Sequence, residues 1–405
     1  MEINLERKLP ILIAGFSTRS IAEAALRSGY SPLTLDYFGD YDQRLLVKNY
    51  SLMRDLGLPF SIKNVLAVFK KIKEEIEALI YISPFENHPQ AVRKLSSGIM
   101  LLGNTPETLK KVRNWRFIRA FTQEEGIGFP ETIFPDEELP QSGSWLLKPE
   151  RSGGGHRIKL WQGEELKKGY FLQKLVKGVP CSAVFAADGK NSVLLGLTEQ
   201  LIGKPELGAE GFTWCGNIFP LELDQENREA LISRIDDICL KLTRSFGLRG
   251  INGIDFVLSE SENTPFLVEV NPRYPASMEL IEQAFHLPAF EIHIQSSQGE
   301  SYYFPLKEKL SQARYHGKGI VYAKQTVEIP PESPNWILAN RKDVPFPGEI
   351  VKKGHPICTV FATGETRDEC WWGLLQEAER LEKELKPFLA VWHKEKEEWK
   401  IGDSC

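Results

Sequence analysis

The first thirty residues change from a continuous apolar run to a helical pattern of apolar and polar positions. Residues 9–16 (LPILIAGF) are almost entirely apolar and close with a glycine before the final aromatic residue. Ser17 or Thr18 can then cap a helix, and Gly29 can end it. The pattern predicts a strand, a tight turn and a helix.

The same alternation continues through the next seventy residues. Residues 31–38 (SPLTLDYF) predict a second strand. Residues 65–80 carry apolar side chains at 65, 68, 69, 72, 76 and 79, the period of an amphipathic helix, and lead into the short strand 78–83. Strands that alternate with helices in this way predict an α/β domain with a doubly wound sheet, which we place at residues 1–105.

A different pattern follows, and it predicts an α+β domain over residues 106–310. Residues 104–126 read as a helical segment that begins at an Asn-Thr-Pro turn, and residues 128–135 form a proline-bounded connector. Beyond it, apolar or alternating runs predict strands, and apolar positions at 231, 235, 238, 242 and 246 predict a long helix that stops at Gly247. The strands are expected at 144–149, 169–176, 181–188, 192–200, 250–260 and 265–273.

Residues 311–405 have a third pattern. Short β-like runs at 317–329 and 343–364 contain Pro-Gly turns, and a charged amphipathic helix follows from about 367 to 386. This predicts a small C-terminal β appendage with a terminal helix.

Composition and charge exclude several classes of protein. The chain has 405 residues and a net charge of −5, with 50 basic and 55 acidic residues interspersed, so no basic stripe suited to nucleic acid is present. Its six cysteines form no Cys-x-x-Cys pair, which favours reduced thiols over a disulfide framework or a zinc site. No apolar run is long enough for a signal or membrane segment. We therefore expect a cytoplasmic protein without nucleic-acid or membrane partners.

Lys148 and the glycines that follow it suggest phosphate chemistry. The lysine ends a predicted strand and precedes the loop RSGGGHR, where backbone N–H groups can approach phosphate oxygens. This is not a P-loop, because the lysine comes before the glycines. A hairpin turn whose glycines only permit positive φ is the alternative.

Oxygen-bearing side chains on two successive predicted strands suggest a metal site. Asp255 lies on the first, and Glu269 and Asn271 lie two residues apart on the second, so they point to the same face. Two carboxylates and an amide oxygen suit Mg²⁺ bound to nucleotide phosphates.

Together these residues resemble those of ATP-grasp ligases such as biotin carboxylase and D-alanine–D-alanine ligase. The resemblance rests on Lys148 and its glycine loop, then on Gln173-Lys174-Leu175-Val176, and then on Asp255 and the Glu-Val-Asn-Pro-Arg sequence that begins at Glu269. The three domains would then be a pre-ATP-grasp domain, the ATP-grasp domain and the appendage.

The resemblance implies roles for individual residues. Lys148 would bind the ATP phosphates, and Arg273 would meet the transferred phosphoryl group or the substrate carboxylate. Mg²⁺ would be held by Asp255, Glu269 and Asn271. The loop Ser152, Gly153, Gly154 and Gly155 would cover the phosphates, and the linker Gln173, Lys174, Leu175 and Val176 would contact adenine and ribose.

Further polar residues are weaker candidates for the substrate side. A second nucleotide-binding lysine is common in such enzymes, but here its expected place near 114–116 offers only Arg116. Gln200 could accompany the metal ligands, with an exposed strand-surface amide as its alternative. The candidates at helix starts, strand ends and loops are Ser17, Arg19, Glu86, Asn87, His88, His156 and Asn252.

The resemblance implies an enzyme that uses ATP and Mg²⁺ to activate a small-molecule carboxylate as an acyl phosphate, which an amine or similar nucleophile then attacks. A bicarbonate-activating carboxylase of the biotin-carboxylase type is the alternative, although no Met-Lys pair offers an in-chain biotin acceptor. A nucleotide-binding regulator without turnover is a third possibility, which three intact metal ligands disfavour. The sequence identifies neither the carboxylate nor the oligomeric state.

Overall fold

Four β-sheets are present in the computed structural model, counted over the residues that it describes, 10–261, 264–311 and 313–389. The N-terminal segment 1–9, which entered the prediction about targeting signals, and Cys405 lie outside these residues. The five cysteines that are described are buried and form no disulfide. No helix in the described ranges is long and apolar enough to cross a membrane.

The N-terminal sheet has five strands in the order β3-β2-β1-β4-β5, and every pair is parallel. Ile11 and Ile13 of β1 pack with α1, whereas Leu12 and Ala14 pack with α4 and α5, so helices cover both faces and the predicted doubly wound sheet is confirmed. The strands are β1 Ile11–Ala14, β2 Leu33–Asp36, β3 Asn49–Ser51, β4 Ala78–Tyr81 and β5 Met100–Leu101. The helices are α1 Arg19–Arg27, α2 Tyr41–Arg44, α3 Leu52–Leu56, α4 Ile62–Ile72, η1 Lys73–Glu75, η2 Phe85–Asn87 and α5 Pro89–Leu95.

Two helices, α6 (Pro106–Val112) and α7 (Trp115–Glu124), occupy the segment that was predicted as one. The break comes at Asn114, whose side chain accepts hydrogen bonds from the backbone N–H groups of Arg116 and Phe117 at 3.1 and 3.2 Å. Asn114 therefore caps a new helix instead of continuing the old one.

A small antiparallel sheet in the order β6-β9-β7-β8 carries Lys148. Its strands are β6 Thr132–Ile133, β7 Trp145–Pro149, β8 Lys159–Leu160 and β9 Tyr170–Lys174. The strands predicted at 144–149 and 169–176 are confirmed as β7 and β9.

The largest sheet has seven strands in the order β14-β13-β10-β11-β12-β15-β18. The helix α8 (Gln225–Phe246) packs on it through the predicted apolar positions, among them Leu231, Ile235 and Leu242. The strands are β10 Gly178–Asp188, β11 Ser192–Ile202, β12 Trp214–Phe219, β13 Arg249–Ser259, β14 Pro265–Asn271, β15 Tyr315–Tyr322 and β18 Pro356–Gly364. The strand β12, the turn η3 Pro205–Leu207 and the helices α9 Met278–Phe285, α10 Ala289–Gln298 and α11 Leu306–Leu310 were not predicted.

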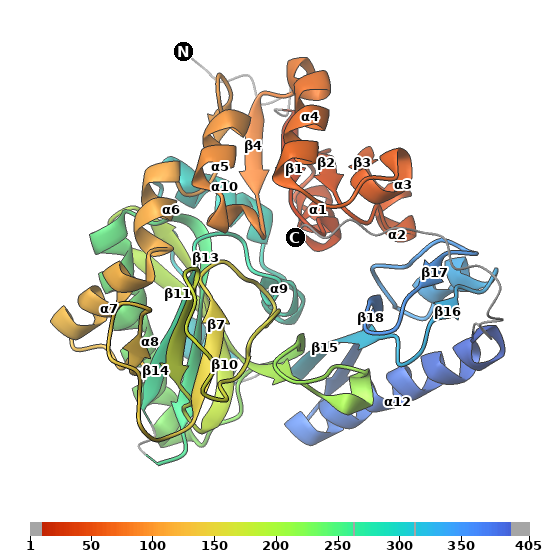
Figure 1. Cartoon of the computed structure of the whole chain (residues 1–405). Helices are drawn as coiled ribbons and strands as arrows, with labels where there is room; N and C mark the ends of the chain where they lie inside the picture. Colours follow the sequence, from red (N-terminus) through yellow and green to blue (C-terminus); the bar gives the residue numbers. More distant parts are fainter. Residues whose placement is uncertain (1–9, 262–263, 312, 390–405) are drawn as a thin grey trace.

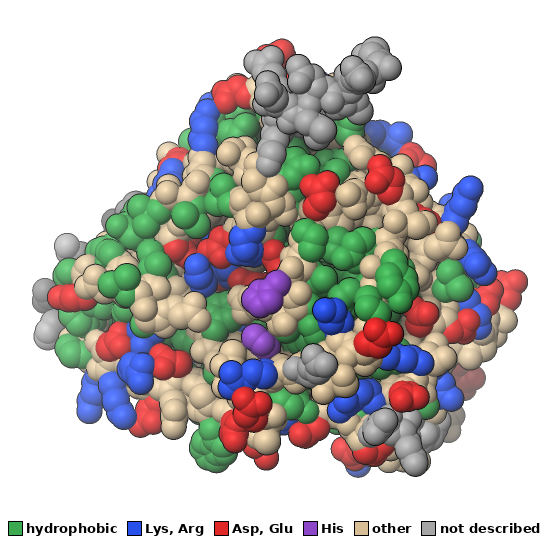
Figure 2. Space-filling model, turned by 180° about the vertical axis from the view of Figure 1, so that it is seen from behind, with side chains coloured by type: hydrophobic (Ala, Val, Ile, Leu, Met, Phe, Trp, Pro, Cys, Tyr) green, Lys and Arg blue, Asp and Glu red, His purple; other side chains and the backbone are tan. Residues whose placement is uncertain are grey.

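The C-terminal strands β15 and β18 extend this large sheet. Strand β15 pairs with β12, with Gly319 of β15 opposite Gly216 of β12, and β18 pairs with β15. The predicted terminal helix is present as α12 (Arg367–Leu385), which packs on β15 and β18 (Figure 1). The remaining elements are β16 Val327–Glu328, β17 Ile350–Val351, η4 Ser333–Ile337 and η5 Lys386–Phe388. Figure 2 shows acidic and basic side chains interspersed on the rear face of the molecule.

Candidate active site

Lys148 is buried on β7 and faces the neighbouring strand β9. Its Nζ donates a hydrogen bond to Gln173 Oε1 at 2.9 Å and lies 5.2 Å from the ring centre of Trp115 and 5.7 Å from that of Phe171. Burial lowers the pKa of Lys148 to about 8, although Glu269 acts in the opposite direction. A cation held in this way is costly to bury and gains most from an anionic ligand.

Residues 174–176 connect the small sheet to the large one. Lys174 is exposed and forms an ion pair with Glu131 at 3.0 Å, and the Leu175 backbone N–H donates to Ser144 O at 2.9 Å. Leu175 and Val176 are half-buried. The linker proposed to contact adenine is therefore held by backbone bonds on its small-sheet side.

The glycine loop joins β7 to β8 and needs glycine at two positions. Gly154 and Gly155 have φ values of 60° and 76°, and a Cβ on Gly155 would lie 1.7 Å from Phe212 O. The Trp214 backbone N–H donates to Gly154 O at 3.0 Å. The loop thus turns a hairpin and rests against residues 212–214 of the large-sheet region.

Asp255 and Glu269 lie opposite each other on β13 and β14, with Gly253 opposite Asn271. Asp255 Oδ2 accepts a hydrogen bond from Asn271 Nδ2 at 2.9 Å, and its Oδ1 accepts one from Gln200 Nε2 at 2.9 Å. Burial, followed by the repulsion of Glu269, raises the pKa of Asp255 to about 7. The structure therefore brings the three predicted metal ligands and Gln200 together.

This donor set fits Mg²⁺. Carboxylate and amide oxygens are the ligands that the ion prefers, and a divalent cation would relieve the repulsion between the two half-buried carboxylates of Asp255 and Glu269. No group of three or more His, Cys, Asp or Glu residues able to hold a metal is found where the structure is described. A bound Mg²⁺ would thus complete its shell with amide, phosphate or water oxygens.

Arg113 is the basic residue that sequence reasoning missed. It ends α6, and its Nη1 donates to Glu269 Oε1 at 2.6 Å and to Val270 O at 3.0 Å, while Nη2 is buried without a hydrogen-bond partner. Arg116, the residue suggested in its place, is 47% exposed and pairs with Asp136 and with Glu137. Arg113 lies one residue before the stretch 114–116 where a second cation was expected.

Arg273 and Glu86 connect the predicted metal ligands to the loop that follows β4. Arg273 Nε donates to Glu86 Oε1 at 3.2 Å, and Nη2 donates to Asn271 Oδ1 at 3.2 Å. Burial opposes ionisation of Glu86, but the charges of Arg273 and Arg113 outweigh it and lower the pKa of Glu86. Its Oε2 atom is buried without a hydrogen-bond partner.

Asn87, the next residue, links the same edge to the glycine loop. Its Nδ2 donates to Ser152 O at 3.2 Å, and its Oδ1 accepts from Arg113 Nε at 3.0 Å. His88 is about half-buried, and burial and Arg151 lower its pKa. The loop after β4 therefore connects the glycine loop with the two arginines Arg113 and Arg273.

The structure corrects two substrate-side predictions. Arg19 is completely buried, and its guanidinium pairs with Glu279, with Asp343 at 2.9 Å and with Glu23 at 3.6 Å, so no donor remains for a substrate anion. Asn252 is also buried, and its amide is occupied by other protein groups. Its Oδ1 accepts a hydrogen bond from Asn104 Nδ2 at 2.7 Å, and its Nδ2 donates one to Gly250 O at 2.8 Å. Both residues hold the fold together.

Two further candidates lie at the edges of the site. Ser17 is half-buried before α1, and His156 is exposed in the glycine loop. Among the described residues, neither side chain forms a hydrogen bond or ion pair with the residues around Asp255.

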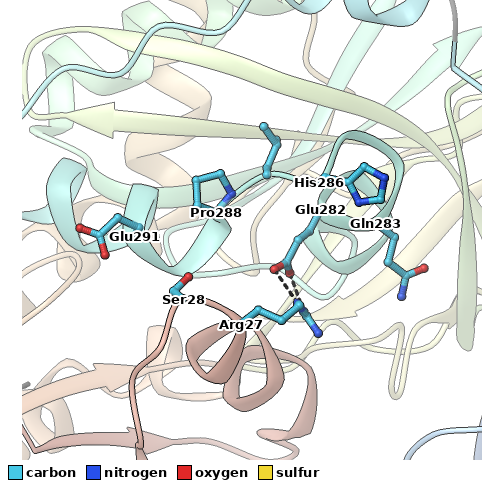
Figure 3. A pocket seen from close by; sticks show the side chains of 8 residues that line it. Arg27, Ser28, Glu282, Gln283, His286, Pro288 and Glu291 are labelled. Atoms are coloured by element: carbon cyan, nitrogen blue, oxygen red, sulfur yellow. Dashed lines mark hydrogen bonds and ion pairs between the residues drawn. The ribbon is translucent and has the colours of Figure 1, made fainter.

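A separate open groove of about 610 Å³ lies between the end of α1 and the helices α9 and α10. The Arg27–Glu282 ion pair, at 2.9 Å, crosses it (Figure 3). None of its lining residues belongs to the cluster around Asp255 and Lys148; they are Arg27, Ser28, Glu282, Gln283, His286, Leu287, Pro288 and Glu291.

The family model of the ATP-grasp domain matches residues 113–277. An uncharacterised protein of Methanocaldococcus jannaschii is 21% identical over 374 residues, which cover 87% of this chain and 88% of that protein. The similarity therefore extends over most of both chains, and the relative's description gives no activity.

Solved structures share the fold at low sequence identity. An L-amino acid ligase from Bacillus licheniformis has a TM-score of 0.67 at 14% identity and covers 92% of this chain and 98% of its own. A biotin carboxylase from Campylobacter jejuni, solved with an ATP analogue, has a TM-score of 0.64 at 14% identity, covering 95% and 92%. A Rhizobium etli pyruvate carboxylase has a TM-score of 0.67 at 15% identity and matches 93% of this chain, which spans only 37% of that longer protein.

Proposed function

We propose, on the premise that residues 113–277 form an ATP-grasp domain, that the protein is an ADP-forming ligase that activates a carboxylate as an acyl phosphate. One observation carries the proposal. Three cations, Lys148, Arg113 and Arg273, surround the paired carboxylates Asp255 and Glu269 through a connected set of hydrogen bonds and charge interactions. Such a set suits phosphoryl transfer, because cations stabilise the negative charge of the phosphoryl group while it is transferred.

The reaction would proceed in two steps. A carboxylate oxygen of the substrate forms a bond to the γ-phosphorus of ATP while the bond to the β-phosphate oxygen breaks, and ADP leaves. The nucleophile then bonds to the acyl carbon while the bond from that carbon to the phosphate oxygen breaks, inorganic phosphate leaves, and the nucleophile gives up a proton.

Each residue would have a distinct part. Lys148 and Arg113 would hold phosphate oxygens, because Lys148 is buried, the Arg113 side chain is only 7% exposed, and Nη2 of Arg113 is buried without a hydrogen-bond partner. Arg273, which Glu86 and Asn271 hold at its Nε and Nη2 atoms, would orient the substrate carboxylate through its guanidinium. Mg²⁺ held by Asp255, Glu269 and Asn271 would supply charge neutralisation at the phosphates.

A hydroxylamine trap tests the proposal. The protein is incubated with Mg-ATP, hydroxylamine and a panel of carboxylates, and hydroxamate and phosphate are measured. We expect equal yields of both with at least one carboxylate, because hydroxylamine intercepts an acyl phosphate. Glu269→Gln should abolish both products and retain the wild-type melting temperature, whereas the control Glu260→Gln, at an exposed position, should behave as wild type.

A bicarbonate-activating carboxylase is the second candidate. The observation that favours it is the similarity of fold to biotin carboxylase and pyruvate carboxylase. It would require bicarbonate for ADP release and incorporate labelled carbon dioxide into an acceptor without forming hydroxamate. If the protein binds ATP but releases no ADP under either condition, both candidates are contradicted. The remaining interpretation is then a nucleotide-binding regulator without turnover.

A further inference from the structure

Four aromatic side chains form a surface cluster, which we call the Phe16 cluster, on the N-terminal domain. Phe16 stacks on Tyr37 with ring centres 5.2 Å apart and planes at 15°, and it meets Phe38 and Phe60 edge-on at 5.1 Å each. Although three rings surround it, Phe16 keeps 39% of its surface exposed. A large apolar ring exposed to water within an aromatic cluster is typical of a binding surface.

The cluster lies at the edge of the parallel sheet where open α/β sheets bind ligands. Phe16 follows β1, and Tyr37 and Phe38 follow β2, whose residues pair in parallel with those of β1 at Ala14–Leu35. The rings of Phe16, Tyr37 and Phe38 therefore lie at the carboxyl ends of these strands, and Phe60 joins them from the segment between α3 and α4. The strand β4 of the same sheet ends in the same direction, toward the large sheet and its helices (Figure 1).

Backbone hydrogen bonds connect this cluster to the candidate active site. The Phe16 backbone N–H donates to Ser83 O at 2.8 Å, and the Tyr37 backbone N–H donates to Phe16 O at 3.1 Å. Ser83 lies three residues before Glu86, which holds Arg273, and Ser83 Oγ is 3.5 Å from the position that a Cβ on Gly153 would occupy. The glycine loop, the residues that hold Arg273 and the Phe16 cluster thus share one edge.

We propose that the Phe16 cluster binds a planar unsaturated ring of the carboxylate substrate, so that the substrate class is ring-bearing organic acids. This inference rests on the proposed function. The ring is assigned to the carboxylate substrate because Phe16 is bonded to the loop that holds Arg273, the residue expected to meet the carboxylate. A ring stacked on Phe16 would remove apolar surface of both partners from water.

Fluorine NMR tests this with fluorinated probes and protein saturated with Mg²⁺ and the β,γ-imido analogue of ATP. We expect fluorophenylacetate to bind and fluorobutyrate to bind more weakly. Phe16→Ala should weaken fluorophenylacetate binding about tenfold, the loss of one stacked pair, and Phe16→Tyr should retain it. The matched control is Phe117→Ala, which removes an exposed phenylalanine from α7, where 53% of its surface is accessible.

Several outcomes would overturn the inference: equal binding of the acyclic acid, unchanged binding to Phe16→Ala, or no binding of any ring-bearing acid. Binding of fluorobenzylamine in place of fluorophenylacetate would move the ring to the nucleophile and would also overturn it. Phe16→Leu, with its melting temperature measured, replaces Phe16→Ala if that variant does not fold. Calorimetry of ATP binding and the hydroxylamine trap on the same samples separate the two proposals, because acyclic acids that are trapped independently of Phe16 would leave the ligase intact.

Discussion

Asp255 and Glu269 face each other across β13 and β14, and burial together with this second carboxylate raises the pKa of Asp255 to about 7. The pair is thus strained electrostatically in the metal-free protein, and the strain is relieved by a proton or by a cation. This gives the site a pH dependence and a metal dependence that can be measured separately.

For the metal-free protein we expect stability to fall as pH rises from about 4 to about 7 because of this group. The folded-state pKa of Asp255 lies above its unfolded value, so the folded state binds the extra proton in that window and loses this advantage as pH increases. Asp255→Asn should therefore raise the melting temperature of metal-free protein above neutral pH and abolish turnover. Added Mg²⁺ should stabilise the wild type and not Asp255→Asn. A metal-free Asp255→Asn protein that melts at the same temperature as metal-free wild type above neutral pH would contradict the arrangement.

The lowered pKa of Lys148 leads us to expect that ATP affinity depends on pH. Its pKa of about 8 means that the free protein loses this positive charge as pH rises through that value. We expect calorimetric ATP affinity to fall between pH 7 and pH 9 by up to about tenfold, as the loss of one charge implies. Lys148→Arg should remove most of this decline, because guanidinium stays charged, and Lys148→Ala should bind weakly at both pH values.

Arg113 and Arg116 form a matched pair for mutation. Arg113 contacts Glu269 and Asn87, whereas Arg116 is half-exposed and pairs with Asp136. We expect Arg113→Ala to reduce ADP release by about a hundredfold, the loss of a buried charged hydrogen bond at a transition state, and Arg116→Ala to change it less than about twofold. The opposite ranking would assign the second nucleotide cation to Arg116.

Gly155 and Gly154 test the glycine loop. Both have positive φ, but a Cβ on Gly155 would collide with Phe212 O, whereas a Cβ on Gly154 would meet no atom within 4 Å. Gly155→Ala should therefore displace the loop and raise the KM for ATP. Gly154→Ala should cost only about 1 kcal/mol of backbone strain and leave the KM nearly unchanged. Equal effects of the two substitutions would show that the contact with residues 212–214 does not matter for ATP binding.

Local patterns in the sequence determined most of the elements that build the site. The period of two places Glu269 and Asn271 on one face of a strand, and the hairpin places Asp255 opposite Glu269, so this group was predictable from neighbouring residues alone. The same holds for Lys148 at its strand end, for the helix α8 with its apolar stripe, and for the strand–helix alternation of the N-terminal domain. All of these depend on residues that are close in the sequence.

Only the tertiary structure decided which distant residues meet. Glu86 reaches Arg273 across 187 positions, and Arg113 reaches Glu269 across 156, contacts that no periodicity encodes. Arg19 was expected to bind an anion because it begins a helix, but Glu279 and Asp343, supplied by two later segments, neutralise it. Strand β15 joins the large sheet beside β12 because backbone groups pair without regard to sequence distance. Short stretches of the sequence determine which side chains share a strand face or a helix face. The partners of a buried charge instead depend on how the whole chain packs.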